Sequence, residues 1–237
     1  MTFLQDWLPI AISMSALLVA MYGLWERNNV LRRAERVRLS EIITDVNGLG
    51  LELLKLPSEL QQAGPAIQTI NTHAELLGQQ AMALLGNFTG TITSTEYRTL
   101  AYWLSNAGYQ SDADQVWRWA VEQANKEGST QSVFALRAYG TFLFQNGNPG
   151  QARIEYEQAV QRNSNLDASY SWMQAETLLF WANNEASVAA HEGRAYDLLD
   201  RADGTLLTLP QFDSRRLQLT ESISRLRHVV AQRANGT

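Results

Sequence analysis

The feature that most constrains the fold is an uncharged apolar segment near the amino terminus. Residues 7–25, WLPIAISMSALLVAMYGLW, run for nineteen positions without a charged side chain. A helix of that length is about 28 Å long, close to the ~30 Å hydrocarbon core of a bilayer. Trp7, Tyr22 and Trp25 stand at its two ends, where amphipathic rings favour the headgroup region. The segment predicts a single membrane-spanning helix, with residues 1–25 as an anchor.

Basic residues next to the span predict its orientation. Residues 26–38 hold five arginines against two glutamates, and we expect Arg27, Arg32 and Arg33 to lie at the membrane interface. Arginine density beside a span marks its cytoplasmic side. We therefore expect a single-pass protein of the bacterial cytoplasmic (inner) membrane, with its N-terminus outside and its C-terminal domain in the cytoplasm. A cleaved signal peptide is disfavoured, because its basic first region is missing here.

Charge and composition exclude several classes of function. The segment 26–38 carries a net charge of +3, whereas residues 39–237 carry −7. The basic segment favours anionic lipid, and the acidic remainder argues against a nucleic-acid partner. There is no cysteine, which excludes disulfides and thiolate metal sites. The rest of the composition favours helix.

No sequence pattern indicates catalysis. The three histidines, His73, His191 and His228, have no metal-ligand spacing, and neither a phosphate-binding glycine loop nor a G-x-S-x-G motif occurs. We expect Glu155 and Glu157 to lie on a solvated helix face, and His191 to form a solvated surface pair with Glu192. We therefore expect no enzymatic activity, no metal and no cofactor.

Two apolar series predict a helical hairpin over residues 39–86. Their members follow one another at spacings of three and four residues, as one face of a helix requires. Pro57, Gly64 and Pro65 separate the series. The first consists of Leu39, Ile42, Val46, Leu49, Leu53 and Leu56, and the second of Ile67, Ile70, Ala74, Leu77, Ala81 and Leu84.

Residues 95–203 predict about three antiparallel helix pairs. In each pair the second helix repeats an alanine, a large apolar residue four positions on, and an alanine three further. This spacing lets two helices approach closely. The repeated residues are Ala113-Trp117-Ala120, Ala152-Tyr156-Ala159 and Ala195-Leu199-Ala202. Thr93 and Glu96 predict a capping box before the first pair, and Asp213 predicts the N-cap of a C-terminal capping helix over residues 212–233.

The middle pair resembles a tetratricopeptide repeat. The resemblance rests on Leu136, Tyr139, Gly140 and Leu143 in the first helix and on Ala152, Tyr156 and Ala159 in the second. The first pair is similar, with Ala101 in place of the usual glycine, and the third fits only with a longer inter-helix loop. The proline that ends a typical repeat is missing from all three. The resemblance implies an all-α fold of tetratricopeptide-like antiparallel helix pairs that follow the transmembrane helix and the hairpin.

The same resemblance implies a groove lined by the first helices. Its inward positions are Arg98 and Tyr102, then Arg137, Thr141 and Phe144, and then Trp172, Glu176 and Leu179. The two arginines resemble the basic clamp that some family members use to hold a peptide carboxylate, although Tyr102 and Thr141 replace its asparagines. In the functional alternative the arginines grip an acidic peptide and the aromatic residues anchor it. In the second alternative, Arg98 and Arg137 form intramolecular ion pairs and bind no partner.

The sequence thus predicts a membrane-anchored helical-repeat adaptor or scaffold that binds a protein partner or acidic peptide at the cytoplasmic membrane face. Membrane lipid would be contacted through the anchor. The alternative is a structural subunit of a homo-oligomeric membrane complex, assembled through the span and the hairpin.

Overall fold

The computed structural model describes residues 3–55, 64–86, 88, 91–188 and 191–235 of the chain. Side chains are described from residue 21 onward, except at residues 50, 53–54, 65–66, 71 and 234–235 within these ranges. The described residues form nine α-helices and one short 3-10 helix, and no strand occurs among them. The all-α prediction is confirmed. The chain divides into two compact units, residues 1–91 and 92–237.

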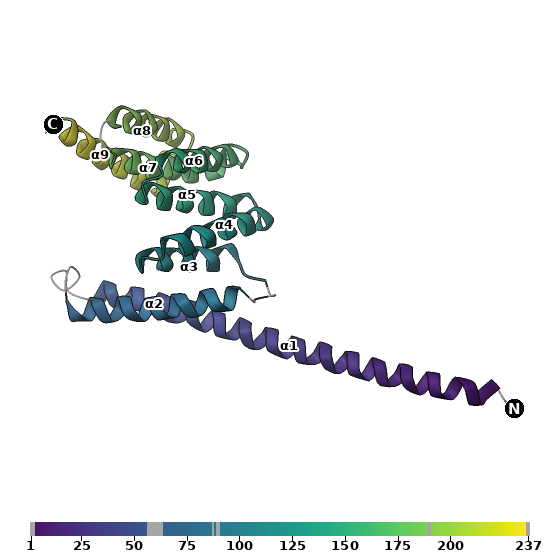
Figure 1. Ribbon diagram of the computed structural model, residues 1–237. Helices are drawn as coiled ribbons and strands as arrows, with labels where there is room; N and C mark the ends of the chain where they lie inside the picture. The colour runs from purple at the N-terminus through teal and green to yellow at the C-terminus, as the bar shows by residue number, and fades with distance from the viewer. Residues whose placement is uncertain (1–2, 56–63, 87, 89–90, 189–190, 236–237) are drawn as a thin grey trace. The chain divides into compact units, whose positions relative to one another are not determined.

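The first unit is a pair of helices (Figure 1). Helix α1 spans Phe3–Lys55 and helix α2 spans Pro65–Leu85, with Pro65 in the first turn, where its missing N–H costs little. The two helices pack against each other. Members of both predicted apolar series are buried here: Leu39, Ile42, Val46 and Leu49 from α1, and Ile70, Ala74, Leu77 and Ala81 from α2.

No helix in the described part of the chain is long and apolar enough to cross a membrane. The helical backbone of the expected span from Trp7 to Trp25 belongs to α1, but the side chains of residues 1–20, Trp7 among them, are not described. Tyr22 and Trp25 are exposed, and their ring centroids lie 5.8 Å apart. Arg27, Arg32 and Arg33 are exposed as well.

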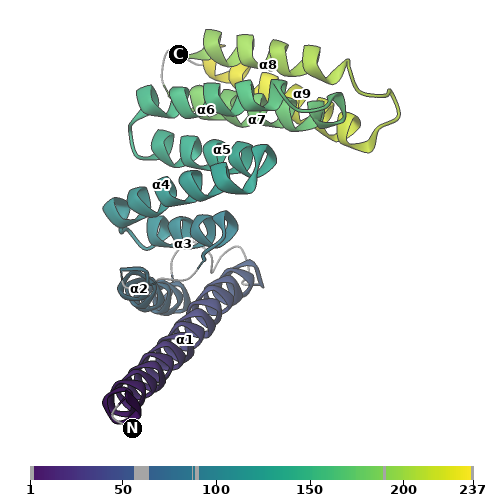
Figure 2. The same ribbon diagram turned by 90° about the vertical axis from the view of Figure 1, so that its right-hand side faces the viewer.

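The second unit is a stack of helices that follow one another in chain order (Figures 1 and 2). Each α-helix packs against the next, and α5 also contacts α3 and α7. The helices are α3 (Ser94–Asn106), α4 (Gln110–Glu127), α5 (Ser129–Gln145), α6 (Pro149–Ser164), η1 (Ala168–Tyr170), α7 (Ser171–Ala186), α8 (Glu192–Leu206) and α9 (Ser214–Asn235).

Close packing of α5 on α6 depends on one glycine. A Cβ atom at Gly140 would lie 2.8 Å from Cδ2 of Tyr156. Ala152 and Ala159 flank that ring on α6 and are fully buried. Because no side chain at residue 140 separates the helices, the Tyr156 ring reaches between them and stacks on Trp181 of α7, with centroids 5.6 Å apart.

Capping hydrogen bonds start the first and last helices of the second unit, α3 and α9, where the sequence predicted. Thr93 accepts a hydrogen bond from the Glu96 backbone N–H, and the Glu96 side chain accepts one from the Thr93 backbone N–H, so the capping box is confirmed. The Asp213 carboxylate accepts hydrogen bonds from the backbone N–H groups of Arg215 and Arg216 at the start of α9. Helix α9 packs on α7 and α8.

Candidate functional site

Four of the predicted partner-binding residues meet in one cavity of about 270 Å³ in the second unit. We name it the aromatic pocket, since five aromatic side chains line it. It lies among α3, α4, α5 and α7. Its lining comprises Arg98, Tyr102, Ser105, Asn106, Trp117, Phe134, Arg137, Ala138, Thr141, Phe142, Gln145 and Phe180.

Arg137 is held by contacts within the protein. Its guanidinium lies 5.2 Å from the ring centroid of Phe134 and 4.7 Å from that of Phe180. It also forms an ion pair with Glu176, and its side chain is only 14% exposed. The alternative of an intramolecular pair therefore holds for Arg137, and Glu176 serves as its partner.

Arg98 differs from Arg137 although the two were expected to act alike. Its guanidinium lies 5.7 Å from the Phe134 ring centroid, and it forms no ion pair with any residue in the described ranges. Burial, and after it the positive charge of Arg137, lower the pKa of Arg98. An arginine in a partly buried site without an anion is a candidate receptor for an anionic ligand group.

Trp117 adds a second unused donor. The residue is 5% exposed, and its indole N–H is buried without a hydrogen-bond acceptor among the described residues. Leaving such a donor unpaired costs about 1–3 kcal/mol. Of the two, the Arg98 guanidinium is the cation of the aromatic pocket that has no anionic partner among the described residues.

The remaining predicted residues have other contacts. The Thr141 hydroxyl shares a 2.7 Å hydrogen bond with the Tyr156 hydroxyl, to which Asn184 donates at 2.8 Å. Tyr102 lies at the pocket rim with 57% of its surface exposed. Trp172 does not line the pocket; its ring instead lies 4.6 Å from the guanidinium of Arg215 in α9.

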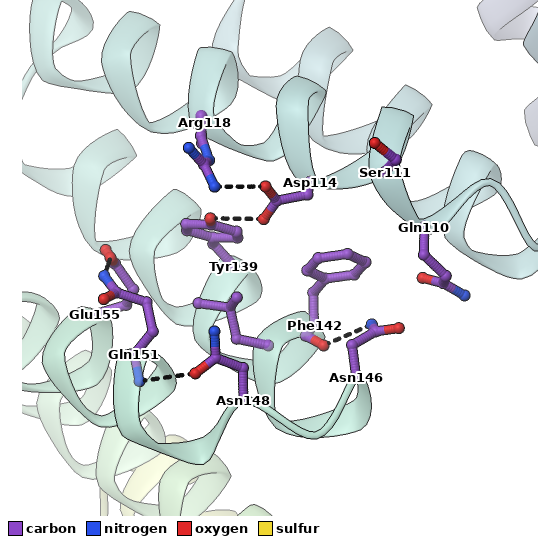
Figure 3. A pocket seen from close by; sticks show the side chains of 11 residues that line it. Gln110, Ser111, Asp114, Arg118, Tyr139, Phe142, Asn146, Asn148, Gln151 and Glu155 are labelled. Carbon is purple, nitrogen blue, oxygen red and sulfur yellow. Dashed lines mark hydrogen bonds and ion pairs between the residues drawn. The ribbon is translucent and has the colours of Figure 1, made fainter.

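A second cavity, of about 690 Å³, lies on another side of α5, and we name it the polar pocket (Figure 3). Sequence analysis did not predict it. Phe142 lines both cavities. Helices α4, α5 and α6 and the loop between α5 and α6 supply its lining: Gln110, Ser111, Asp114, Arg118, Tyr139, Phe142, Leu143, Asn146, Asn148, Gln151 and Glu155.

Asp114 has two partners in the polar pocket. Figure 3 shows the Tyr139 hydroxyl and the Arg118 guanidinium both reaching its carboxylate, at 2.8 Å and 2.7 Å. Burial, followed by the hydrogen bond to Asp114, raises the pKa of Tyr139 to about 12. Tyr139 is therefore a neutral donor at physiological pH.

Glu155 contradicts the prediction of a solvated face. It is 7% exposed, and Gln151 donates a 2.6 Å hydrogen bond to its carboxylate. Burial raises the pKa of Glu155, and the hydrogen bond from Gln151 and the charge of Arg118 offset only part of that rise. Glu157, two residues on, faces solvent as predicted. Residues two positions apart point to nearly opposite sides of a helix, and α6 is covered on one face only. Glu155 therefore lies on the covered face and Glu157 on the solvent face.

Sequence analysis also missed a buried ionic cluster around Glu185. This carboxylate is 0% exposed and accepts hydrogen bonds from Arg153 at 2.7 and 2.8 Å and from the Trp181 indole at 3.0 Å. Arg194 lies 3.1 Å away and His191 Nδ1 3.3 Å away. The expectation of a solvated His191–Glu192 pair is therefore wrong for His191. The cluster connects α6, α7 and α8, and its members are too far apart in sequence for a local motif to reveal it.

Comparison with protein-family models, curated proteins and solved structures finds no match to this chain. Among the described residues, no group of three histidine or acidic side chains is placed to hold a metal ion. The aromatic pocket and the polar pocket are therefore the candidate functional sites.

Proposed function

We propose that this protein is a membrane-anchored, tetratricopeptide-like adaptor that binds an acidic segment of a protein partner at the cytoplasmic membrane face. The observation that carries the proposal is Arg98, a partly buried cation that has no anionic partner among the described residues and lies in a cavity lined by aromatic side chains. A carboxylate in the aromatic pocket pairs with Arg98. Neighbouring apolar groups of the partner pack on Tyr102 and Phe180.

The pocket favours an anion over other ligand groups. Arg98 presents donors only, and a guanidinium pairs with a carboxylate in a charge-assisted geometry. Aromatic residues and arginine are also the side chains that most often dominate binding energy at protein interfaces. The small volume of the pocket suits one or two side chains of a larger partner.

The anchor proposal rests on the amino-terminal sequence and on α1. Exposed apolar side chains follow the undescribed part of the span, among them Met21, Tyr22, Leu24 and Trp25. Exposed arginines come next along the helix. Tethering at a membrane raises the effective concentration of the pocket for partners held at the same surface, so modest affinity suffices.

The test compares what co-purifies with the tagged full-length protein in mild detergent and with an Arg98→Glu variant. The matched control is Arg201→Glu, which reverses an exposed arginine on α8. Arg137 is unsuitable for substitution, because its ion pair and ring contacts hold the fold. We expect a partner that is captured by wild type and Arg201→Glu and is lost with Arg98→Glu.

A second step identifies the ligand chemistry. The bound segment of the partner is mapped, and its peptide is titrated beside a version with amides in place of the acids. At least a tenfold loss of affinity in the amide version supports the proposal. Equal affinity, or capture unchanged by Arg98→Glu, contradicts it.

A second candidate function is a structural subunit of a homo-oligomeric membrane complex. Val30, Leu31 and Val37 favour it, because these exposed apolar side chains of α1 lie beyond the predicted span. Burial of such a stripe against other copies would stabilise an oligomer. Light scattering of the purified protein tests this: a stable oligomer disrupted by Val30→Glu and Val37→Glu supports the second candidate, and a monomer excludes it.

A further inference from the structure

The polar pocket contains a carboxylate that its own residues do not neutralise. Asp114 is paired with Arg118, whereas Glu155 accepts a hydrogen bond from the neutral amide of Gln151. Within the described ranges, no cation lies within ion-pair distance of Glu155. Ionised carboxylates are rarely buried without a cation, because desolvation of the charge is costly.

The rings in the same cavity limit the shape of the missing cation. Tyr139 and Phe142 both line the pocket, and their rings lie 6.2 Å apart at an interplanar angle of 19°. A flat delocalised cation stacks on such faces, and its parallel N–H groups match a carboxylate. A divalent metal ion fits poorly, because the described residues offer it no third acidic or histidine ligand.

We propose that the polar pocket binds a guanidinium group, as carried by an arginine side chain of a protein partner, with the Glu155 carboxylate as its counter-ion and the Tyr139 ring, which lies between Glu155 and Phe142 in Figure 3, as its stacking surface. The cavity, at about 690 Å³, holds such a side chain and part of the adjoining backbone. Asn146 and Asn148 at the α5–α6 loop supply amide groups for that backbone (Figure 3).

This site is independent of the one proposed around Arg98. The two cavities share Phe142, but no charged side chain lines both. Failure of either proposal therefore leaves the other intact. If both hold, a partner would present an acidic group on one side of α5 and an arginine on another.

The probe is N-acetyl-arginine methylamide, titrated against the full-length protein by ligand-observed NMR. Its control is N-acetyl-citrulline methylamide, which has almost the same shape and no charge. We expect saturable binding of the arginine compound and at least tenfold weaker binding of the citrulline compound. Equal binding of the two, or no saturable binding of the arginine compound, would overturn the proposal.

Two variants locate the site. Glu155→Gln removes the charge and keeps the shape, and we expect it to weaken binding of the arginine compound at least tenfold. Glu157→Gln removes an exposed carboxylate from the same helix and should leave affinity unchanged. Circular dichroism and thermal melting verify that both variants are folded. Affinity unaltered by Glu155→Gln, or reduced equally by both, would show that the compound binds elsewhere.

The pH dependence of binding supplies a second readout. Asp114 and Arg118 of α4 and Tyr139 of α5 are the other ionisable groups that line the cavity. Protonation of Glu155 removes the counter-ion, so affinity falls as the pH is lowered through its raised pKa. We expect that step to disappear in Glu155→Gln. A wild-type profile identical to that of the variant would contradict the assignment.

Discussion

At the scale of single residues, Glu185 shows how a fully buried carboxylate is tolerated in this helical stack. Burial raises its pKa, but hydrogen bonds from Arg153 and Trp181 and the positive charges of Arg153 and Arg194 more than offset that effect, so the net pKa of Glu185 is lowered. Its partners lie on α6 and α8, and the carboxylate therefore links three helices. Glu155 has no comparable set of donors, which is why its pKa shifts in the opposite direction.

We expect Glu185→Gln to lower the free energy of unfolding by about 2–3 kcal/mol. Removal of one member of a buried pair leaves the other charge unpaired, and partial exposure of Arg153 (24%) and Arg194 (44%) keeps the loss below the largest values seen. Urea denaturation of the full-length protein measures it. The control is Glu122→Gln, which removes an exposed pair with Lys126 and should have little effect.

The pH dependence of that loss has a definite sign. Because the pKa of Glu185 is lower in the folded chain than in the unfolded chain, its contribution is present above an unfolded value of about 4.3. It is lost as the pH falls through the folded pKa. The stability difference between wild type and Glu185→Gln should consequently shrink below about pH 4. A difference that stays constant from pH 7 to pH 3 would contradict the ionic origin.

At the scale of helices, the contact between α5 and α6 organises the second unit. Gly140 permits the Tyr156 ring to lie against the α5 backbone, and that ring in turn contacts Phe144 and Trp181. The Tyr156 hydroxyl bonds to Thr141 and Asn184. Helices α5, α6 and α7 are thus positioned around one buried ring. Helix α5, one of the three, lines both pockets.

Gly140→Ala should destabilise the protein by about 1–3 kcal/mol, because the added methyl group would overlap the Tyr156 ring. Higher helix propensity opposes this by at most about 1 kcal/mol. Gly150→Ala on α6 is the matched control, since a Cβ atom there meets nothing within 4 Å, and it should be neutral or slightly stabilising. Thermal melting compares the two. Equal melting temperatures would show that the contact relaxes without cost.

At the scale of the whole molecule, the proposed function needs the amino-terminal anchor in the membrane and the pockets in the cytoplasm. The absence of cysteine from the sequence makes this directly testable, because a single introduced thiol is the only one that a maleimide can label. Suitable positions are Thr2, before the predicted span, and Ser169, an exposed residue of the second unit.

We expect a membrane-impermeant maleimide to label the Thr2→Cys variant in intact cells and the Ser169→Cys variant only after permeabilisation. Arginine density next to the span is the physical reason for that orientation. The protein should also stay with the membrane through an alkaline wash and leave it in detergent, whereas a chain without residues 1–25 should be released by the wash. The reverse labelling pattern, or release of the full chain, would refute the proposed topology.

The sequence by itself determined the features that depend on near neighbours. Apolar residues at spacings of three and four predicted the helices, the Thr93–Glu96 and Asp213 signals predicted where two of them begin, and small residues such as Gly140 and Ala152 predicted close helix contacts. These features follow from 3.6 residues per turn and from backbone hydrogen bonding within one turn. The resemblance to a tetratricopeptide repeat, and not these local features, placed Arg98, Tyr102, Arg137 and Thr141 together in one predicted groove.

Only the tertiary structure decided which of these side chains remain free to bind. Arg98 and Arg137 occupy equivalent predicted positions, but Glu176 of α7 neutralises Arg137 alone. Likewise Glu155 and Glu157 look alike in sequence, and only the first is buried. Burial and ion pairing depend on which helix covers which face. Those contacts join residues some thirty to forty positions apart, beyond the range of any local pattern.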